Sequence, residues 1–148
     1  MSTYTQILYQ IVFSTKYREK TLIKEDRILL FQCIWKILQR KNCHLYQVNG
    51  VEDHLHIITS LHPSQPLAML VKDIKLGTHS LIKETGILKQ FNGWQNGYSA
   101  FTYAIGAKKN LINYVRNQEE HHRTVPYLEE LIALLKEHGI EFDERYLD

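Results

Sequence analysis

The stretch Asp53-His-Leu-His-Ile-Ile-Thr-Ser60 alternates polar and apolar side chains from His54 to Ile57, which is the pattern of a β-strand with two different faces. Successive side chains of a strand point to opposite faces, so the imidazoles of His54 and His56 lie on one face. Leu55 and Ile57 lie on the other face, where they can enter a hydrophobic core. The sequence therefore predicts a strand that presents two histidines together.

Three further strands surround this one in the predicted order of elements. The run His44–Val51 is separated from His54–Ser60 by only two acidic residues, so the two runs are expected to pair as an antiparallel hairpin. Thr5–Ser14 is rich in Ile, Val, Tyr and Phe and has no glycine or proline, which favours a first strand. Tyr98–Ile105 is predicted as the last strand.

Apolar residues at helical spacing predict four helices. Their predicted ranges are Lys24–Lys41, Pro66 to about Glu84, Ala107 to about His121, and Pro126–His138. The order is strand, helix, strand, strand, helix, strand, helix, helix. It indicates an α+β fold, with a ferredoxin-like or RNA-recognition-like antiparallel sheet, helices packed on one face and the tyrosine-bearing helix near the C-terminus.

Length and composition suit one globular unit. The chain has 148 residues and 44% hydrophobic content, so residues 1–148 are predicted to form a single domain around one core. The formal charge of +2 does not identify a class of partner. Only two cysteines, Cys33 and Cys43, are present, and no apolar run is long enough to cross a bilayer, so a cytoplasmic protein without membrane segments is expected.

The histidine pair is a candidate metal site. Two residues of strand rise separate the Cα atoms of His54 and His56 by roughly 6.6 Å, a span that two rings can close around one cation. The alternative is that the two histidines are polar residues on the solvated face of an antiparallel strand, which needs no metal. The pair alone does not decide between these interpretations, because a third ligand is needed.

The predicted helix from Lys108 to His121 offers a nucleophile and a further ligand. Asn110, Tyr114 and Gln118 fall at i, i+4 and i+8 and form a polar line along it. A separate packing stripe consists of Leu111, Ile112 and Val115. Tyr114 can attack a phosphodiester if a nearby cation favours its phenolate, since an unperturbed tyrosine has a pKa near 10. Gln118 can offer its carbonyl oxygen to the same cation. Alternatively, Tyr114 is an ordinary packing residue and Gln118 a solvated one.

Four stretches in this order give the sequence a resemblance to a known family. They are the opening run Thr3–Lys16, the motif Asp53-His-Leu-His-Ile57, the stretch Phe91–Phe101, and Tyr114-Val-Arg-Asn-Gln118. Together they resemble the single-tyrosine HUH transposases of the smallest bacterial and archaeal insertion sequences, a group that includes the repeat-associated tyrosine transposases. The resemblance extends from about residue 3 to about residue 123.

This resemblance implies a function and an active site. It implies a divalent metal, Mg²⁺ or Mn²⁺, bound by His54, His56 and Gln118. It implies that Tyr114 attacks single-stranded DNA next to a hairpin, forming a 5′-phosphotyrosine intermediate that is used for strand transfer and DNA transposition. His121 and His122 follow on the same helix. Assistance to the metal or DNA is one role open to them, and capping of the helix C-terminus is the expected role of a basic pair there.

The implied partners are single-stranded DNA with hairpin ends and a second copy of the chain. Basic side chains are expected to contact the DNA backbone. The candidates are Lys16, Arg18, Lys72, Lys75, Lys108, Lys109 and Arg116. Gly106 is a candidate hinge that would let Tyr114 dock on the histidines of its own chain or of a partner. The resemblance favours a homodimer with shared active sites, and the sequence leaves open which chain supplies the tyrosine.

Three other functions remain compatible with the sequence. The first is a non-catalytic or domesticated module that binds hairpin DNA with the same fold. The second is a metal-dependent phosphodiesterase that uses water and leaves no protein attached to DNA. The third is a structural interaction domain without affinity for divalent metals.

Overall fold

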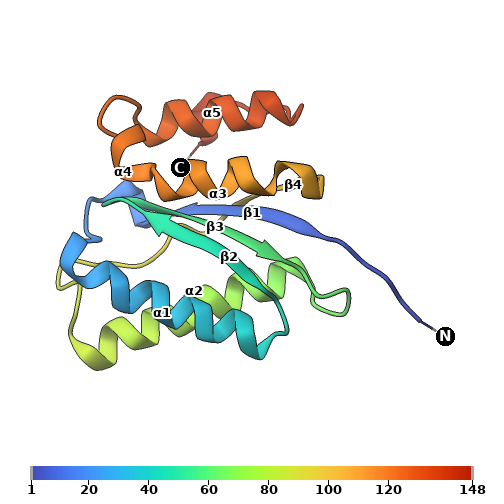
Figure 1. Ribbon diagram of the computed structural model, residues 1–148. Helices are drawn as coiled ribbons and strands as arrows, with labels where there is room; N and C mark the ends of the chain where they lie inside the picture. The colour runs from blue at the N-terminus through green and yellow to red at the C-terminus, as the bar shows by residue number, and fades with distance from the viewer. Residues whose placement is uncertain (1, 148) are drawn as a thin grey trace.

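The computed structural model describes residues 2–147 and is built around a four-stranded antiparallel sheet (Figure 1). The strands are β1 (Leu8–Ser14), β2 (Leu45–Gly50), β3 (His54–Ser60) and β4 (Ser99–Tyr103). Their spatial order is β2-β3-β1-β4. The two central strands, β1 and β3, pair so that Ser14 lies opposite His54 and Val12 lies opposite His56.

Helices connect and cover these strands. They are α1 (Lys24–Arg40), α2 (Leu67–Thr85), α3 (Lys108–Arg116), α4 (Gln118–His121) and α5 (Tyr127–Glu137). Short 3₁₀ turns are η1 (Lys16–Arg18), η2 (Ile105–Ala107) and η3 (Glu144–Tyr146). The order β1-α1-β2-β3-α2-β4, with β1 and β3 in the centre of the sheet, is the ferredoxin-like arrangement, so the predicted fold class is confirmed.

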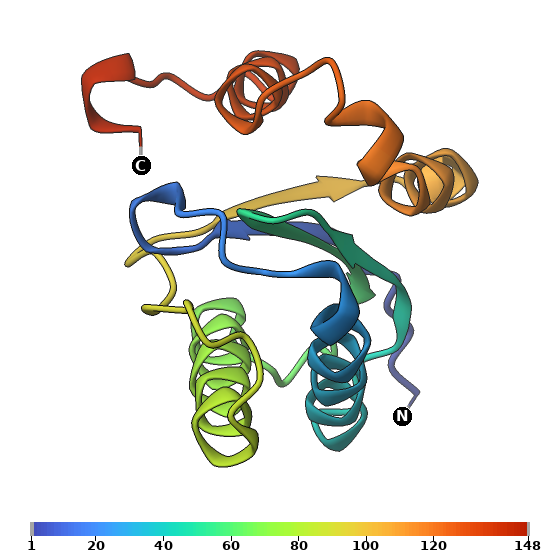
Figure 2. The ribbon, with the colours of Figure 1, turned by 90° about the vertical axis from the view of Figure 1, so that its left-hand side faces the viewer.

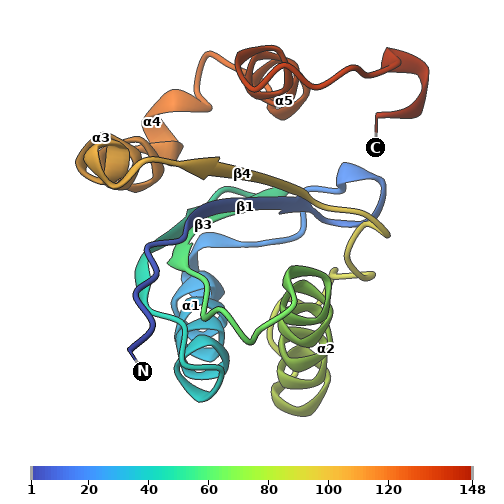
Figure 3. The same cartoon turned by 90° about the vertical axis from the view of Figure 1, so that its right-hand side faces the viewer.

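Helices cover both faces of the sheet (Figures 2 and 3). α1 and α2 pack on one face, where the main core contains Phe13 of β1 and both Leu55 and Ile57 of β3. α3, α4 and α5 lie over the opposite face, so the expectation that the helices pack on one face of the sheet was wrong. There, Val12 packs with α5 and Ile58 packs with α3. The second layer of helices therefore covers the face that carries the histidines.

The predicted tyrosine helix is interrupted. Asn117 has φ −96° and ψ 22°, which ends α3 at Arg116 and lets α4 start at Gln118. The side-chain amide of Asn49 on β2 donates to the Arg116 carbonyl at 3.0 Å, so this carbonyl is held by the sheet rather than by the helix. The expectation of one continuous helix up to His121 was therefore wrong at this point.

No helix within residues 2–147 has the length and apolar character that crossing a bilayer requires.

The chain turns sharply between β2 and β3 next to the histidine motif. A Cβ atom added at Gly50 would lie 2.5 Å from the His54 carbonyl oxygen and 2.6 Å from Leu55 Cδ2. Only glycine allows this approach of the two strands without a shift of backbone atoms.

Gly50→Ala is therefore expected to lower the free energy of unfolding by about 1–3 kcal/mol, because the added methyl group overlaps backbone that cannot move freely. Urea unfolding followed by circular dichroism measures the change. Gly106→Ala is the matched control, since a Cβ at Gly106 would meet nothing within 4 Å. Equal stability of the two variants would contradict this account of the turn.

Candidate functional site

The two histidines of β3 are buried on the sheet face below α3, α4 and α5. His54 and His56 are both 0% exposed. Leu55 and Ile57 enter the core on the opposite face, as the alternating pattern predicted. The interpretation of the pair as polar residues on a solvated face is therefore excluded.

The segment α3–α4 brings Tyr114 and Gln118 to these histidines. Leu111 and Val115 are buried against the sheet, as predicted for the packing stripe. This anchoring turns the half-buried Tyr114 toward β3, and its ring centroid lies 5.8 Å from that of His56. Gln118 is completely buried. The four residues that the sequence predicted for the metal and the nucleophile therefore lie in one region of a single chain.

Contacts with α1 hold α4 in place. Glu119 of α4 pairs with the buried Arg27 at 3.4 Å and with Lys24 at 3.2 Å. The Arg27 Nε also donates to the Leu22 carbonyl at 2.7 Å, which fixes the guanidinium. These contacts fix the end of the tyrosine segment next to β2 and β3.

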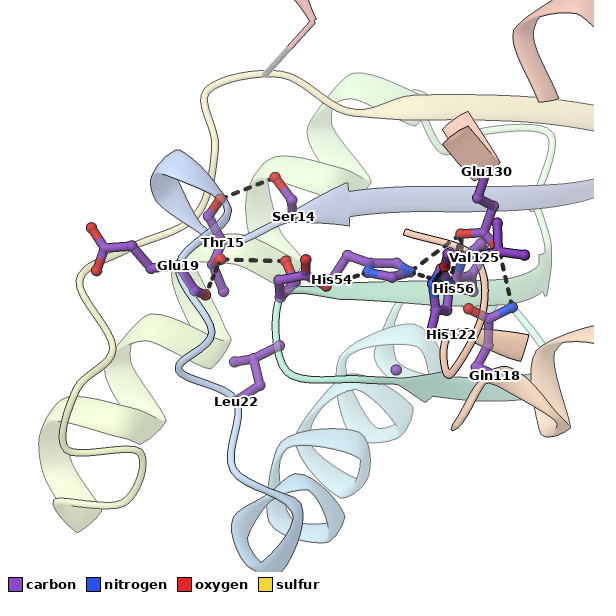
Figure 4. Close-up of polar contacts among 12 residues, drawn as sticks. Ser14, Thr15, Glu19, Leu22, His54, His56, Gln118, His122, Val125 and Glu130 are labelled. Atoms are coloured by element: carbon purple, nitrogen blue, oxygen red, sulfur yellow. Dashed lines mark hydrogen bonds and ion pairs between the residues drawn. The ribbon is translucent and has the colours of Figure 1, made fainter. Parts of the chain in front are cut away.

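A residue that the sequence reasoning missed, Glu130 of α5, lies at the centre of the site (Figure 4). It is 3% exposed. One carboxylate oxygen, Oε1, lies 2.8 Å from His56 Nε2, 3.1 Å from His122 Nε2 and 3.2 Å from His54 Nε2. Three imidazoles therefore converge on one oxygen atom.

The second carboxylate oxygen faces the tyrosine segment. Glu130 Oε2 accepts a hydrogen bond from the Tyr114 phenol. The amide Nε2 of Gln118 donates to the same oxygen at 3.2 Å, and His121 Nε2 lies 3.1 Å from it. Glu130 thus connects the histidine group to the candidate nucleophile.

The sequence contained a signal for Glu130. Tyr127, Leu131 and Leu134 form the buried stripe of α5, and Glu130 falls within the same spacing. A carboxylate in the apolar stripe of a helix must find buried partners, because an isolated buried charge is costly. His122 lies at the C-cap of α4, and its Nε2 also reaches Glu130 Oε1, so this residue belongs to the site as well as to the end of the helix.

The Nδ1 atoms of the three imidazoles are all held by acceptors. The acceptors are the Asp53 carboxylate for His54 at 2.7 Å, Gln10 Oε1 for His56 at 2.8 Å, and the Val125 carbonyl for His122 at 2.5 Å. With a hydrogen on each Nδ1, every Nε2 faces inward, as an N–H when the ring is protonated and as a lone pair when it is neutral. The neutral form is the tautomer that a metal requires of a histidine ligand.

A partly buried chain of hydrogen bonds fixes the orientation of Gln10. Its Nε2 donates to the Tyr103 hydroxyl at 2.9 Å, which leaves Oε1 to accept from His56. The Tyr103 hydroxyl lies 3.1 Å from His138 Nε2, directly after the end of α5. The orientation of the His56 ring therefore depends on contacts with β4 and the C-terminal end of α5.

The residues fit a divalent cation. Ligand atoms of His54, His56, His122 and Glu130 all lie within 4.8 Å of one another. Two ligands at right angles and about 2.1 Å from one cation are about 3.0 Å apart, close to the separations at Glu130 Oε1. The buried Oε1 of Gln118 has no hydrogen-bond partner among residues 2–147, so it is also free to bind a cation. Imidazole and carboxylate donors together suit manganese and zinc.

The shared burial and pairing shift the pKa values of the site. Burial acts to raise the pKa of Glu130, but the imidazole hydrogen bonds outweigh it and hold that pKa well below its usual range. Burial lowers the pKa of His56 to about 4. Burial acts in the same direction on His54, but hydrogen bonds to Asp53 and Glu130 raise its pKa above the ordinary value. Burial and the charge of Glu130 raise the pKa of Tyr114, so a positive charge is needed to favour its phenolate.

The predicted DNA-contacting residues fall on both sides of the sheet. Lys108, Lys109 and Arg116 belong to α3, on the face that carries the site, whereas Lys72 and Lys75 belong to α2 on the opposite face. Lys16 and Arg18 form part of η1.

Lys75 has a clear structural role, and the surroundings of Gly106 are open. Lys75 Nζ donates to the carbonyls of Gln95 at 2.8 Å and Gly97 at 2.6 Å, so it braces the loop before β4. Gly106, the candidate hinge, lies in η2, where an added Cβ would meet nothing within 4 Å.

A hollow of about 840 Å³ borders the site. Asp53, His122 and Tyr127 form the part of its wall next to the imidazoles. Its basic residues are Lys20, Lys24, Arg27 and Arg123, and its acidic residues are Glu25, Glu52, Asp53 and Glu119. The basic residues predicted from the sequence do not line it.

Comparisons with known proteins agree with this fold. A family model described as "Transposase IS200 like" matches residues 3–118. A solved structure of a candidate transposase from Deinococcus radiodurans R1 is similar with a TM-score of 0.64 and 20% identity, over 80% of this chain and 95% of that chain. A REP-associated tyrosine transposase, solved bound to a REP hairpin, is similar with a TM-score of 0.63 and 15% identity, over 84% of this chain and 76% of that chain. No curated protein matches.

Acidification is expected to destabilise the metal-free protein between pH 6.5 and about 4, the interval between the ordinary and folded pKa values of His56. The unfolded state binds a proton there that folded His56 does not, so the free energy of unfolding falls by about 2–3 kcal/mol. The raised pKa of His54 has the opposite sign, and its contribution is already complete below pH 6.5. Glu130 begins to lose its contribution only below about pH 4.5.

Urea unfolding with a chelator, at several pH values across this interval, measures the slope. His56→Gln removes the titrating ring and should flatten the curve. A stability that stays constant or rises on acidification through this interval would contradict the assignment.

Proposed function

The chain belongs to the family of IS200-like transposases, and on this basis we propose that it cleaves and rejoins single-stranded DNA through Tyr114. One observation carries the proposal. A single buried carboxylate, Glu130, contacts both the phenol of Tyr114 and the inward-facing Nε2 atoms of His54 and His56. A nucleophile and a cation-binding group are thereby held on one sheet face.

Tyr114 is the proposed catalytic residue. Its oxygen bonds to the phosphorus of a DNA phosphodiester, and the bond from phosphorus to the 3′ oxygen breaks. The products are a 5′-phosphotyrosine and a 3′ hydroxyl, which carries the hydrogen that the phenol loses. Because the covalent link conserves the phosphodiester, a 3′ hydroxyl of another DNA end can reverse the step, so strand transfer needs no nucleotide cofactor.

His54 and His56 would hold the divalent cation, with the free Oε1 of Gln118 within the same buried group. Charge on the five-coordinate phosphorus would be offset by this cation. Mg²⁺ and Mn²⁺ are the proposed ions. Asp53 and Gln10 support the reaction by fixing the rings of the two histidines.

The proposed substrate is single-stranded DNA next to a hairpin. One structural relative was solved with a REP hairpin, which supports this class of DNA for the present chain. The hollow beside His122 offers a path for a strand to the site, with Lys24 and Arg123 available to phosphates. A homodimer with shared active sites stays a prediction. One chain already brings Tyr114 and the histidines together, so this arrangement of the site does not require a second chain.

The proposal predicts a covalent protein–DNA adduct. The protein is mixed with Mn²⁺ and a labelled single strand that carries a hairpin from the DNA flanking its gene, and a denaturant-resistant band is sought. Tyr114→Phe should abolish the band, because the nucleophilic oxygen is lost. His56→Ala should reduce its rate of formation by about 10–100-fold or more, and chelation of the metal should abolish it.

Tyr4→Phe is the matched control and should leave the band unchanged, because Tyr4 is 91% exposed in the segment before β1. Peptide mass spectrometry should place the nucleotide on Tyr114. A band that persists in Tyr114→Phe would refute the proposal. DNA binding without any adduct would favour the non-catalytic module, and cleaved DNA free of protein would favour the phosphodiesterase.

A further inference from the structure

The family model ends at residue 118, and two of the groups in the buried cluster lie beyond it. His122 directly follows α4, and Glu130 lies on α5. Nothing in the family match assigns a role to either residue. Their contacts are with the residues that the proposed function uses.

We propose that the segment after residue 118 completes the metal centre, with Glu130 as a ligand that also holds the nucleophile. Oε1 of Glu130 and Nε2 of His122 join the imidazoles of β3 around the cation. Oε2 keeps its hydrogen bond from the Tyr114 phenol. The inference rests on the proposed function for the identity of the nucleophile, but the ligand assignment stands on the geometry of the cluster.

The hydrogen-bond pattern supports ligands rather than a purely polar cluster. His54 Nε2 and His122 Nε2 are 3.0 Å apart, although the Nδ1 atom of each ring already donates elsewhere. Two neutral rings in this tautomer would turn lone pairs toward each other, which is repulsive. The arrangement becomes favourable when a positive charge lies between the rings, and a shared cation provides one for all three imidazoles.

The charge balance of the buried site points in the same direction. A carboxylate with 3% exposure needs a compensating positive charge. A proton on His54 or a divalent cation supplies it, and only the cation faces all three rings and the carboxylate at once. One carboxylate leaves the centre with a single net positive charge, which still attracts a phosphodiester anion.

The two oxygens of Glu130 explain how the nucleophile is positioned. Because Oε1 lies among the imidazoles and Oε2 accepts from Tyr114, one rigid carboxylate separates the phenol oxygen from the cation. Gln118 Nε2 holds Oε2 from a second direction at 3.2 Å. A side chain that touches both the metal and the attacking group is a catalytic residue, and this role falls to Glu130.

Metal binding tests the ligand assignment without any DNA. Mn²⁺ is titrated into metal-free protein by calorimetry, with electron–nuclear double resonance to count the bound imidazole nitrogens. Glu130→Gln, which keeps the shape of the side chain, should weaken binding by about tenfold or more. His122→Ala should weaken binding and reduce the imidazole count from three to two.

Glu129→Gln is the matched control, because Glu129 is an exposed neighbour on the same helix. It should bind Mn²⁺ like the unmodified protein. Circular dichroism and melting temperature show whether each variant is folded, and His122→Ala provides an independent measurement if Glu130→Gln is unstable. Unchanged Mn²⁺ affinity in both folded variants would overturn the assignment.

The rate of adduct formation tests the contact with Tyr114. At saturating Mn²⁺, Glu130→Gln should still form the adduct more slowly, since the phenol loses its charged acceptor. Complete recovery at saturating metal would overturn the role of Oε2. Faster adduct formation than in the unmodified protein would show that Glu130 blocks the site instead, and would also overturn the proposal.

Failure of this inference differs from failure of the proposed function. Tyr114→Phe should abolish the adduct while leaving Mn²⁺ affinity nearly unchanged. If the unmodified protein forms no adduct but loses metal affinity on Glu130→Gln, the ligand assignment survives and the transfer reaction does not.

Discussion

Hydrogen bonds at Nδ1 fix the orientation of three imidazole rings, those of His54, His56 and His122. Each Nδ1 faces an acceptor, supplied by Asp53, Gln10 or the Val125 carbonyl. The remaining nitrogens then converge on the buried Glu130, where unbalanced charges and facing lone pairs are costly. The packing of helices over the second sheet face, and the chemistry proposed for the site, both follow from this convergence.

The site is assembled from segments that are far apart in the sequence. The central strands supply the two paired histidines and Gln10, and the strand register brings these side chains together. α3 supplies Tyr114 because its apolar stripe seals against the same face. The contacts that bury the apolar stripe of α3 also orient Tyr114, so folding of the chain assembles the site.

The sequence predicted the features that depend on neighbouring residues, but not those that depend on contacts between segments far apart in the chain. The β3 histidines and the Tyr114–Gln118 pair follow local periodicity, so their faces were predicted correctly. The helical spacing of α5 indicates that Glu130 is buried, but its partners are set by the docking of α5 across the sheet, which no local pattern encodes. The break at Asn117 also depends on a distant contact, the amide of Asn49, and intrinsic helix preference could not reveal it.

Helix α5 and its C-cap residue His138 are connected to both ring nitrogens of His56. Glu130 contacts its Nε2 directly, and His138, eight positions later, reaches its Nδ1 through Tyr103 and Gln10. Because of these two contacts, the packing of α5 on the sheet and the binding of a cation at His56 are thermodynamically linked. If packing of α5 on the sheet makes the free energy of cation binding more favourable, a bound cation must stabilise α5 against detachment from the sheet by the same amount. Release of the ion and loosening of the C-terminal layer are therefore reciprocal events.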